Sequence, residues 1–188
     1  MFDTLRRTLN TLYPLSDADW TLFQSCLQAK QYAKNKPLLS AGQVCRGIWF
    51  VSRGAIRSCV VKDGSDVHIG FSFETEYVTE YESLTKGQPS TVTIVALERT
   101  DTIYFGRDEL IALYQQTPTL MQLGQIILEN VIVRQNQYAA LFTLYSPTER
   151  YNFLLENYPQ IVQRVPVQYI ASYLGMARET LSRIRQKK

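Results

Sequence analysis

The sequence has few of the residues from which enzymes and metalloproteins build their sites. Its three cysteines, Cys26, Cys45 and Cys59, are widely separated, so the C-x-x-C spacing of zinc and iron–sulfur sites is absent and isolated thiols are expected. The single histidine, His68, lies in an alternating segment typical of a strand, which argues against a Ser-His or Cys-His catalytic pair. The sequence also lacks a Gly-rich phosphate loop. We therefore expect no enzyme, no catalytic residue, no metal and no cofactor.

Long hydrophobic runs are also missing. No apolar segment approaches the roughly 20 residues that a membrane-spanning helix needs. The first residues, MFDTLRRTLNTLY, include the acidic Asp3 and place their apolar side chains on one helix face, unlike a signal peptide. A cytoplasmic protein with no membrane contact is expected. The 188 residues, 45% of them apolar and 20% charged, suit one large globular domain or two small ones.

The small net charge of +3 is unevenly distributed along the chain. Residues 164–188 contain six Arg and Lys residues against Glu179 alone, a balance of +5, so the preceding 163 residues sum to −2. This distribution predicts a polyanionic partner for the C-terminal segment.

Hydrophobic periodicity divides the chain into three regions. Two amphipathic helices are expected first, the second capped by Ser16. From about Lys30 to Phe105, glycines separate short runs of β-branched and aromatic residues, and Asp63-Gly64 predicts a tight hairpin. Such strands predict a sandwich, barrel or roll of antiparallel sheet. The expected helices cover residues 3–12 and 17–27, and the expected strands lie within 47–61, 66–73, 91–98 and 101–105.

A helical period begins at about Asp108. A short helix there is expected to end at Pro118, and residues 119–146 then continue for about seven turns without proline. Two interpretations stay open. The long helix packs on its own sheet, or it pairs with a second copy; its length favours the pair, because an average globular helix has about 11 residues. The positions spaced alternately by four and three are Leu120, Gly124, Ile127, Val131, Arg134, Tyr138 and Leu141.

The C-terminal region predicts a helix-turn-helix. Ser146, Pro147 and Glu149 form a capping-box pattern that starts one helix, and Pro166 is placed to begin a later one. Two helices that cross closely need a small residue at the crossing and a glycine in the turn, which Ala171 and Gly175 supply. The apolar positions that would seal the crossing are Ile170, Leu174, Met176, Leu181 and Ile184.

The last helix then presents polar side chains outward. Glu179, Ser182, Arg183 and Gln186 fall on one stripe beside Arg178, and these residue types contact base edges and phosphates in DNA grooves. The alternative is a solvated face with a Glu179–Arg183 ion pair, worth about 0.3–0.5 kcal/mol. The basic balance and the helix-turn-helix context favour DNA.

The chain resembles the CRP/FNR family of bacterial transcription regulators in this order of elements and above all in the segment GMARETLSRI. Two longer segments, ERYNFLLENYP and VPVQYIASYLGMARETLSRIR, are similar to Bacteroidetes-type members of that family. The resemblance implies an α+β fold with a cyclic-nucleotide-binding-like β-roll, a long dimerisation helix and a helical helix-turn-helix domain that lacks the family's β-wing. The expected domains are 1–116, 117–145 and 146–188.

The resemblance also implies roles for individual residues. Those matching Arg178, Glu179 and Arg183 contact base edges in the family, and those matching Thr180 and Ser182 lie near phosphates. Arg185, Lys187 and Lys188 are expected to replace the wing's contacts as a flexible basic tail that supplies charge without register. Ala177 stands where the family usually has a capping Ser or Thr, a change worth about 1 kcal/mol.

The family's cyclic-nucleotide cassette is altered here. In YVTEYESLTKGQPSTV, Glu80 matches the ribose-binding Glu, Thr79 replaces the Gly, and Ser90, followed by Thr91, replaces the Arg that neutralises the phosphate. Glu74, Glu76, Glu80 and Glu82 add like charge, against Lys86 alone. We expect an effector pocket at Thr79, Glu80, Ser90 and Thr91 that does not bind cAMP or cGMP in the family's manner.

The expected function is that of a homodimeric transcription regulator that reads a palindromic site in double-stranded DNA, with RNA polymerase as a partner and an unidentified small-molecule effector. The alternative is a ligand-binding β-roll signalling module with a vestigial DNA-binding domain, motivated by Ala177 and the missing wing. An enzyme has little support, since paired carboxylates within Glu74–Glu82 are typical of a solvated strand edge.

Overall fold

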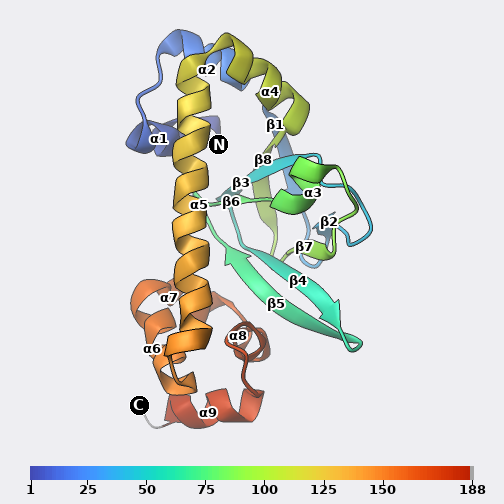
Figure 1. The fold of residues 1–188 in the computed structure, drawn as a ribbon, viewed down its shortest axis with the longest axis vertical. Coiled ribbons are helices and arrows are strands. Elements are labelled where there is room, and N and C mark those ends of the chain that lie inside the picture. Colours follow the sequence, from blue (N-terminus) through green and yellow to red (C-terminus); the bar gives the residue numbers. More distant parts are fainter. Residues whose placement is uncertain (187–188) are drawn as a thin grey trace.

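The computed structural model describes residues 1–186, apart from the side chain of residue 134. Two four-stranded antiparallel sheets form a roll, in the orders β1-β8-β3-β6 and β2-β7-β4-β5. Helices gather at one end of the roll, and the long helix α5 runs from them to a second group of helices (Figure 1). The predicted antiparallel roll is confirmed. Its strands are β1 (Gln28–Tyr32), β2 (Pro37–Leu39), β3 (Gly47–Arg53), β4 (Ile56–Lys62), β5 (Ser65–Ser72), β6 (Tyr77–Val78), β7 (Val92–Ala96) and β8 (Thr100–Gly106).

The first group of helices closes one end of the roll. Leu5 and Leu9 of α1 are buried, as the helical spacing predicts, and the Ser16 hydroxyl accepts from the Asp19 amide at 3.1 Å to cap α2. Together these helices bury one hydrophobic core against β3 and β8, while a second core fills the space between the two sheets. The helices are α1 (Phe2–Leu12), α2 (Asp17–Gln24) and α4 (Arg107–Gln116); a short α3 (Tyr81–Lys86) follows β6.

The hairpin between β4 and β5 forms where Asp63-Gly64 predicts it. Both residues have positive φ, 51° for Asp63 and 75° for Gly64, so the turn matches the right-handed twist of the strands. Lys62 pairs with Ser65 across the turn, and pairing continues to Ile56 and Ser72. Strand β5 of this hairpin contacts α8 of the C-terminal region (Figure 1).

The long helix α5 (Pro118–Leu144) is anchored at both ends and free in its middle. Leu120 and Leu123 are buried near its start, and Leu141 is buried near its end. Gly124 is one of the positions spaced alternately by four and three. It faces Tyr114 of α4, and a β-carbon at this position would collide with the tyrosine side chain. The first residues of the four-and-three series, Leu120 and Gly124, therefore pack within the chain itself. This agrees with the interpretation in which the long helix packs on its own chain. Between residues 129 and 137, every described side chain is exposed.

The C-terminal region is helical throughout its described part. The capping box at the start of α6 is confirmed, because the Ser146 amide donates to Glu149 at 2.8 Å and the Glu149 amide donates to the Ser146 hydroxyl at 3.4 Å. Pro166 is the residue before α8 and not its first residue, so that prediction was wrong by one position. The helices are α6 (Pro147–Asn157), α7 (Pro159–Arg164), α8 (Val167–Tyr173) and α9 (Arg178–Gln186).

The C-terminal helices share a hydrophobic core with the roll, which we call the roll–helix cluster. Phe71 of β5 and Phe73 directly after it are each 3% exposed and pack among side chains of α6, α7, α8 and α9. The proposed domain boundaries at 116 and 145, and the missing β-wing, stay predictions. The buried members of the cluster are Ala55, Phe71, Phe73, Leu97, Tyr151, Leu154, Ile161, Val165, Ile170, Ala171, Leu174 and Leu181.

Candidate nucleic-acid interface

Helices α8 and α9 cross as the sequence predicts. Ala171 is 2% exposed, which lets the helices approach closely, and Gly175 has the left-handed φ of +64° that the turn requires. The Met176 amide donates to the Ala171 carbonyl at 3.0 Å, so the end of α8 is closed by its own turn. Leu181 is fully buried against this pair, which orients α9 with its opposite side to solvent.

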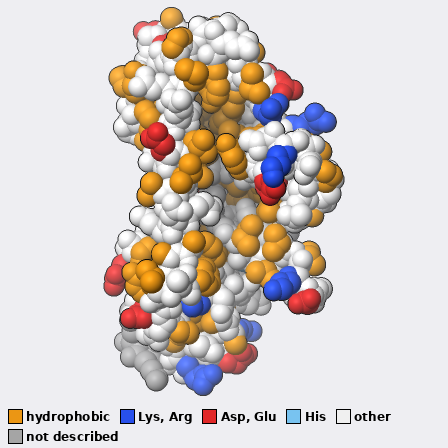
Figure 2. All heavy atoms as spheres, in the orientation of Figure 1, with side chains coloured by type: hydrophobic (Ala, Val, Ile, Leu, Met, Phe, Trp, Pro, Cys, Tyr) orange, Lys and Arg blue, Asp and Glu red, His pale blue; other side chains and the backbone are white. Residues whose placement is uncertain are grey.

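The outer side of α9 carries the predicted DNA-contacting residues. Thr180 is half-buried, and Lys187 and Lys188 lie outside the described residues. Arg183 donates to the backbone carbonyl of Glu179 at 3.4 Å, whereas no ion pair joins these two side chains, both of which the structure describes. Charged side chains mark this end of the molecule in Figure 2. The exposed members of the predicted set are Arg178, Glu179, Ser182, Arg183 and Arg185.

Arg164 does not belong to this surface, although it was counted in the basic C-terminal segment. Its guanidinium donates to both oxygens of Glu74, at 2.7 and 3.0 Å, and to Glu98 at 2.5 Å. Both carboxylates belong to the roll. The hydrogen bonds from Arg164 hold the pKa of Glu74 well below its usual range, at about 2. Arg164 therefore attaches α7 to the roll and adds little to the positive field around α9.

His68 lies in the second polar contact between the roll and these helices. The strand position predicted for it is confirmed, but its ring is 3% exposed and stacks on Tyr169 of α8 with the centroids 4.2 Å apart. Its backbone amide donates to the Ser172 hydroxyl at 3.0 Å. Burial, and then the nearby Arg57 with Nη1 3.2 Å from His68 Nε2, lowers the pKa of His68 to about 4, with Asp66 opposing.

The hydroxyls of two predicted effector residues, Thr79 and Ser90, form hydrogen bonds with backbone groups elsewhere in the chain. Ser90 is 3% exposed, and its hydroxyl donates to the Val92 carbonyl at 2.8 Å and accepts from the Val92 amide at 2.9 Å. The Thr79 hydroxyl donates to the Gly47 carbonyl at 2.9 Å. Thr91 is exposed. The hydroxyls of Thr79 and Ser90 therefore already have hydrogen-bond partners within the chain.

The four acidic residues near the cassette each have a structural partner. Glu74 pairs with Arg164, and Glu76 accepts from the Phe73 amide at 3.0 Å. Glu80 caps α3, accepting from the amides of residues 82 and 83 at 3.1 and 2.8 Å, and Glu82 pairs with Lys86 at 2.8 Å. The expected like-charge field is therefore reduced. Both carboxylate oxygens of Glu80 are used to cap α3.

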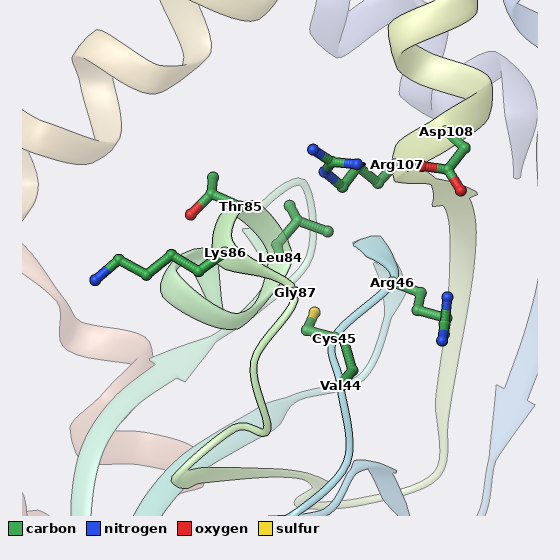
Figure 3. Close-up of a pocket in the computed structure, with 9 residues that line it drawn as sticks. All are labelled: Val44, Cys45, Arg46, Leu84, Thr85, Lys86, Gly87, Arg107 and Asp108. Carbon is green, nitrogen blue, oxygen red and sulfur yellow. Dashed lines mark hydrogen bonds and ion pairs between the residues drawn. The ribbon is translucent and has the colours of Figure 1, made fainter.

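A cavity of about 240 Å³ opens on the other side of α3. Figure 3 shows that Arg46 and Lys86 extend to opposite sides of it, and that Arg107 lies above it. Lys86 is paired with Glu82, and Arg107 with Asp108 at 3.2 Å. The basic side chains drawn there point in different directions and two of them are paired with carboxylates, so this cavity gives no basis for an anion site.

The described residues also bear on metal, thiol and membrane-spanning sites. Within the described residues, no group of three or more His, Cys, Asp or Glu side chains could hold a metal ion. All three cysteines are free thiols, as predicted. No described helix is both long and apolar enough to cross a membrane.

Residues 29–117 match the family model of the cyclic nucleotide-binding domain. The match begins in β1 and ends between α4 and α5, so it covers the whole roll. The arrangement of that roll with a long helix and a terminal helix-turn-helix is shared with solved regulator structures. Over these residues the chain is similar to the cyclic nucleotide-binding domain, and it has the CRP/FNR fold.

Three solved structures show how similar this chain is to other proteins with the CRP/FNR fold. FixK2 from Bradyrhizobium japonicum is 18% identical, with a TM-score of 0.74 over 86% of this chain and 83% of its own. The c-di-GMP responsive regulator CLP from Xanthomonas campestris is 17% identical, with a TM-score of 0.71 over 92% and 91%. The catabolite activator protein of Thermus thermophilus is 19% identical, with a TM-score of 0.59 over 96% and 85%. Among curated proteins, no sequence matches significantly.

Several residues that organise this CRP/FNR fold escaped the sequence analysis. Arg164 was counted only as a charge, His68 only as a strand residue, and Arg150 and Tyr138 only as helix positions. Each makes its decisive contact with a residue at least 24 positions away. Periodicity reports local structure, so the sequence contains no signal for these pairs.

The pH dependence of stability should report on His68. It is the only histidine, and its folded pKa of about 4 lies below the usual 6.5. As pH falls below 6.5, the unfolded chain binds a proton that the folded chain does not. The free energy of unfolding should therefore decrease, by at most about 1.4 kcal/mol per pH unit. Urea unfolding between pH 7.5 and 5.5 measures this slope.

The variant His68→Gln should have a flatter slope over the same range, whatever its stability at pH 7.5. Arg57→Gln is the matched comparison, because it removes the cation next to the ring and should raise the pKa of His68. An identical slope in the wild type and in His68→Gln would show that His68 is not held neutral.

Proposed function

We propose that this protein is a sequence-specific DNA-binding transcription regulator. The observation that carries the proposal is the two-sided character of α9. Leu181 is fully buried, while Arg178, Glu179, Ser182 and Arg183 are exposed on the helix that follows the Gly175 turn. Arg can pair with guanine and Glu can accept from cytosine, so this face suits the major groove. RNA polymerase as a partner follows from the family resemblance alone.

The free middle of α5 supports a homodimer. Val131, Ile132 and Val133 are 42%, 51% and 55% exposed, in a stretch that makes no buried contact within the described chain. Hydrophobic side chains recur along α5 on the face shown in Figure 2. A second copy of α5 would cover such a surface. Two-fold symmetry would present two α9 helices to a palindromic site, with half-sites about 34 Å apart.

The sensor half is similar to the cyclic nucleotide-binding domain, but we propose that it does not bind cAMP or cGMP in the family's manner. Ser90 stands at the position of the phosphate-binding Arg, and its hydroxyl is bonded to Val92. Glu80 is used as the cap of α3. A phosphate here would lack the Arg, and Lys86, the one cation of the cassette, is paired with Glu82, so the phosphate would lose hydration without replacement. The chemical class of an effector is left open.

DNA selection tests the main proposal. Purified protein, with and without a metabolite extract, is offered a random duplex library, and recovered sequences are expected to contain a palindrome. Binding should also weaken steeply with salt, because phosphate contacts release counterions. A flat salt response on every duplex would favour the alternative, a β-roll signalling module with a vestigial DNA-binding region.

Removing Arg183 should change base preference. Arg183→Ala is expected to cost about 1–3 kcal/mol on the selected site and to relax the preference at one base pair. Fluorescence anisotropy against single-base operator variants measures both effects. Arg46→Ala, which removes an exposed charge from the roll, is the control and should leave the base preference unchanged. Equal losses on all sequences would instead assign Arg183 to phosphate.

Charges placed on the free middle of α5 should separate the dimer. Ile132→Glu with Val133→Glu introduces a better helix former at both positions but buries like charges in a helix pair, which should weaken association by more than about 100-fold. Sedimentation velocity measures this shift. Val61→Glu, at a 67% exposed position on the hairpin, is the control. An unchanged dimer would place the interface elsewhere.

Calorimetry with cAMP and cGMP should give no binding at micromolar concentrations. The variant Ser90→Arg restores the missing cation but breaks the bonds to Val92 and leaves Glu80 as a cap, so it should not restore binding on its own. Micromolar affinity in the unmodified protein would contradict the assignment of the cassette.

A further inference from the structure

Arg150 connects the ends of two helices that the proposed regulator must hold together. It lies in the second turn of α6, and its guanidinium donates to carbonyls at the end of α5: Nε to Leu141 at 3.2 Å and to Tyr145 at 3.0 Å, and Nη2 to Phe142 at 3.3 Å. Nη1 donates to Leu174, at the end of α8, at 3.1 Å. One side chain therefore bonds the C-terminal ends of α5 and α8.

The charge of Arg150 suits this position. The last carbonyls of a helix lack partners within the helix and carry partial negative charge. Two such ends lie close together here, and the guanidinium between them satisfies acceptors from both. Its planar fork of five N–H groups can reach several carbonyls at once, whereas a lysine ammonium offers three donors on a single nitrogen.

Tyr138 makes a second link between the same helices. Its hydroxyl donates to the Tyr173 carbonyl at 2.8 Å, and the two rings stack with centroids 4.7 Å apart and planes 17° apart. Tyr138 belongs to α5, and Tyr173 is the last residue of α8. The carbonyls of residues 173 and 174 are thus both bound from outside α8.

The turn itself packs on this group. Arg150 lies over the Phe142 ring at 4.8 Å, and a β-carbon on Gly175 would lie 3.0 Å from Phe142 Cε1. The turn between α8 and α9 therefore contacts the same part of α5 that Arg150 bonds. We call Tyr138, Phe142 and Arg150 the turn clamp.

We propose that Arg150 and Tyr138 are positioning residues that set the spacing between the two DNA half-sites. The turn clamp fixes where α9 begins relative to α5. If two copies of α5 form the dimer, the clamp also fixes the separation and angle of the two α9 helices. Neither side chain lies on the outer face of α9, so base preference within a half-site is left to Arg178, Glu179 and Arg183. This assignment rests on the proposed function.

The experiment separates spacing from affinity. The selected half-site is placed in palindromes whose central spacer is unchanged, or is shortened or lengthened by one and by two base pairs, and in a duplex with one half-site. Binding is measured by fluorescence anisotropy for the wild type, Arg150→Gln, Arg150→Lys and Tyr138→Phe. The controls are Arg46→Gln and Tyr81→Phe, which change exposed side chains of the roll. Circular dichroism checks that each variant is folded.

The wild type is expected to prefer one spacer by about tenfold or more, a difference of about 1.4 kcal/mol. The clamp variants should keep the affinity for one half-site within about twofold, while their preference between spacers falls below about threefold. The spacer preference of Arg150→Lys should be close to that of Arg150→Gln, because the planar guanidinium is needed and the positive charge alone is not sufficient. Both controls should match the wild type.

Two results would overturn the assignment. The clamp variants could keep the spacer preference of the wild type, or they could lose half-site affinity and palindrome affinity in parallel, as simple destabilisation predicts. Tyr138→Phe removes one hydroxyl only, so it decides the matter if Arg150→Gln does not fold. If the wild type selects no duplex at all, the proposed function fails and the assignment fails with it. A sharp spacer preference that survives every substitution rejects the assignment alone.

Discussion

The position of the C-terminal helices depends on the roll–helix cluster. Phe71 and Phe73 reach from the edge of the roll into a core whose other members are contributed mainly by α6, α7, α8 and α9. Buried aromatic side chains of this size each remove about 150–250 Å² from water, so two of them make a large contribution to the contact. Because Leu181 belongs to the same core, burying these rings also decides which side of α9 faces outward.

Hydrophobic burial is not directional, so the polar contacts around the cluster select one way of docking. Arg164 binds two carboxylates of the roll, and its bidentate contact with Glu74 tolerates little rotation. On another side, His68 stacks on Tyr169 and remains neutral at ordinary pH. A charged imidazole would be unfavourable beside Arg57, so the contacts around the roll–helix cluster combine the two ion pairs of Arg164 with one uncharged aromatic contact.

Features that depend on neighbours in sequence could be predicted, and those that depend on distant contacts could not. The Asp63-Gly64 hairpin, the capping box at Ser146 and the Gly175 turn each follow from local backbone preferences. The short strands β1, β2 and β6 and the helix α3 have too few residues to show a period. The His68 amide bonds to Ser172, 104 residues away, and no local pattern reveals such a pair. The exposed side chains of α9 and its crossing with α8 were predicted, whereas the distant contacts that attach these helices to the roll and to α5 were not.

The free middle of α5 has a consequence for how the protein gains its stability. A helix segment without packing on its own chain is marginal in water, because helix formation alone stabilises it little. Val131, Ile132 and Val133 would therefore be ordered largely by a second copy. In the proposed homodimer, folding and association would then be linked by mass action, and the melting temperature would rise with protein concentration. At low concentrations in a cell, the fraction of chains in which an ordered α5 connects the roll to the C-terminal helices would then depend on the protein concentration.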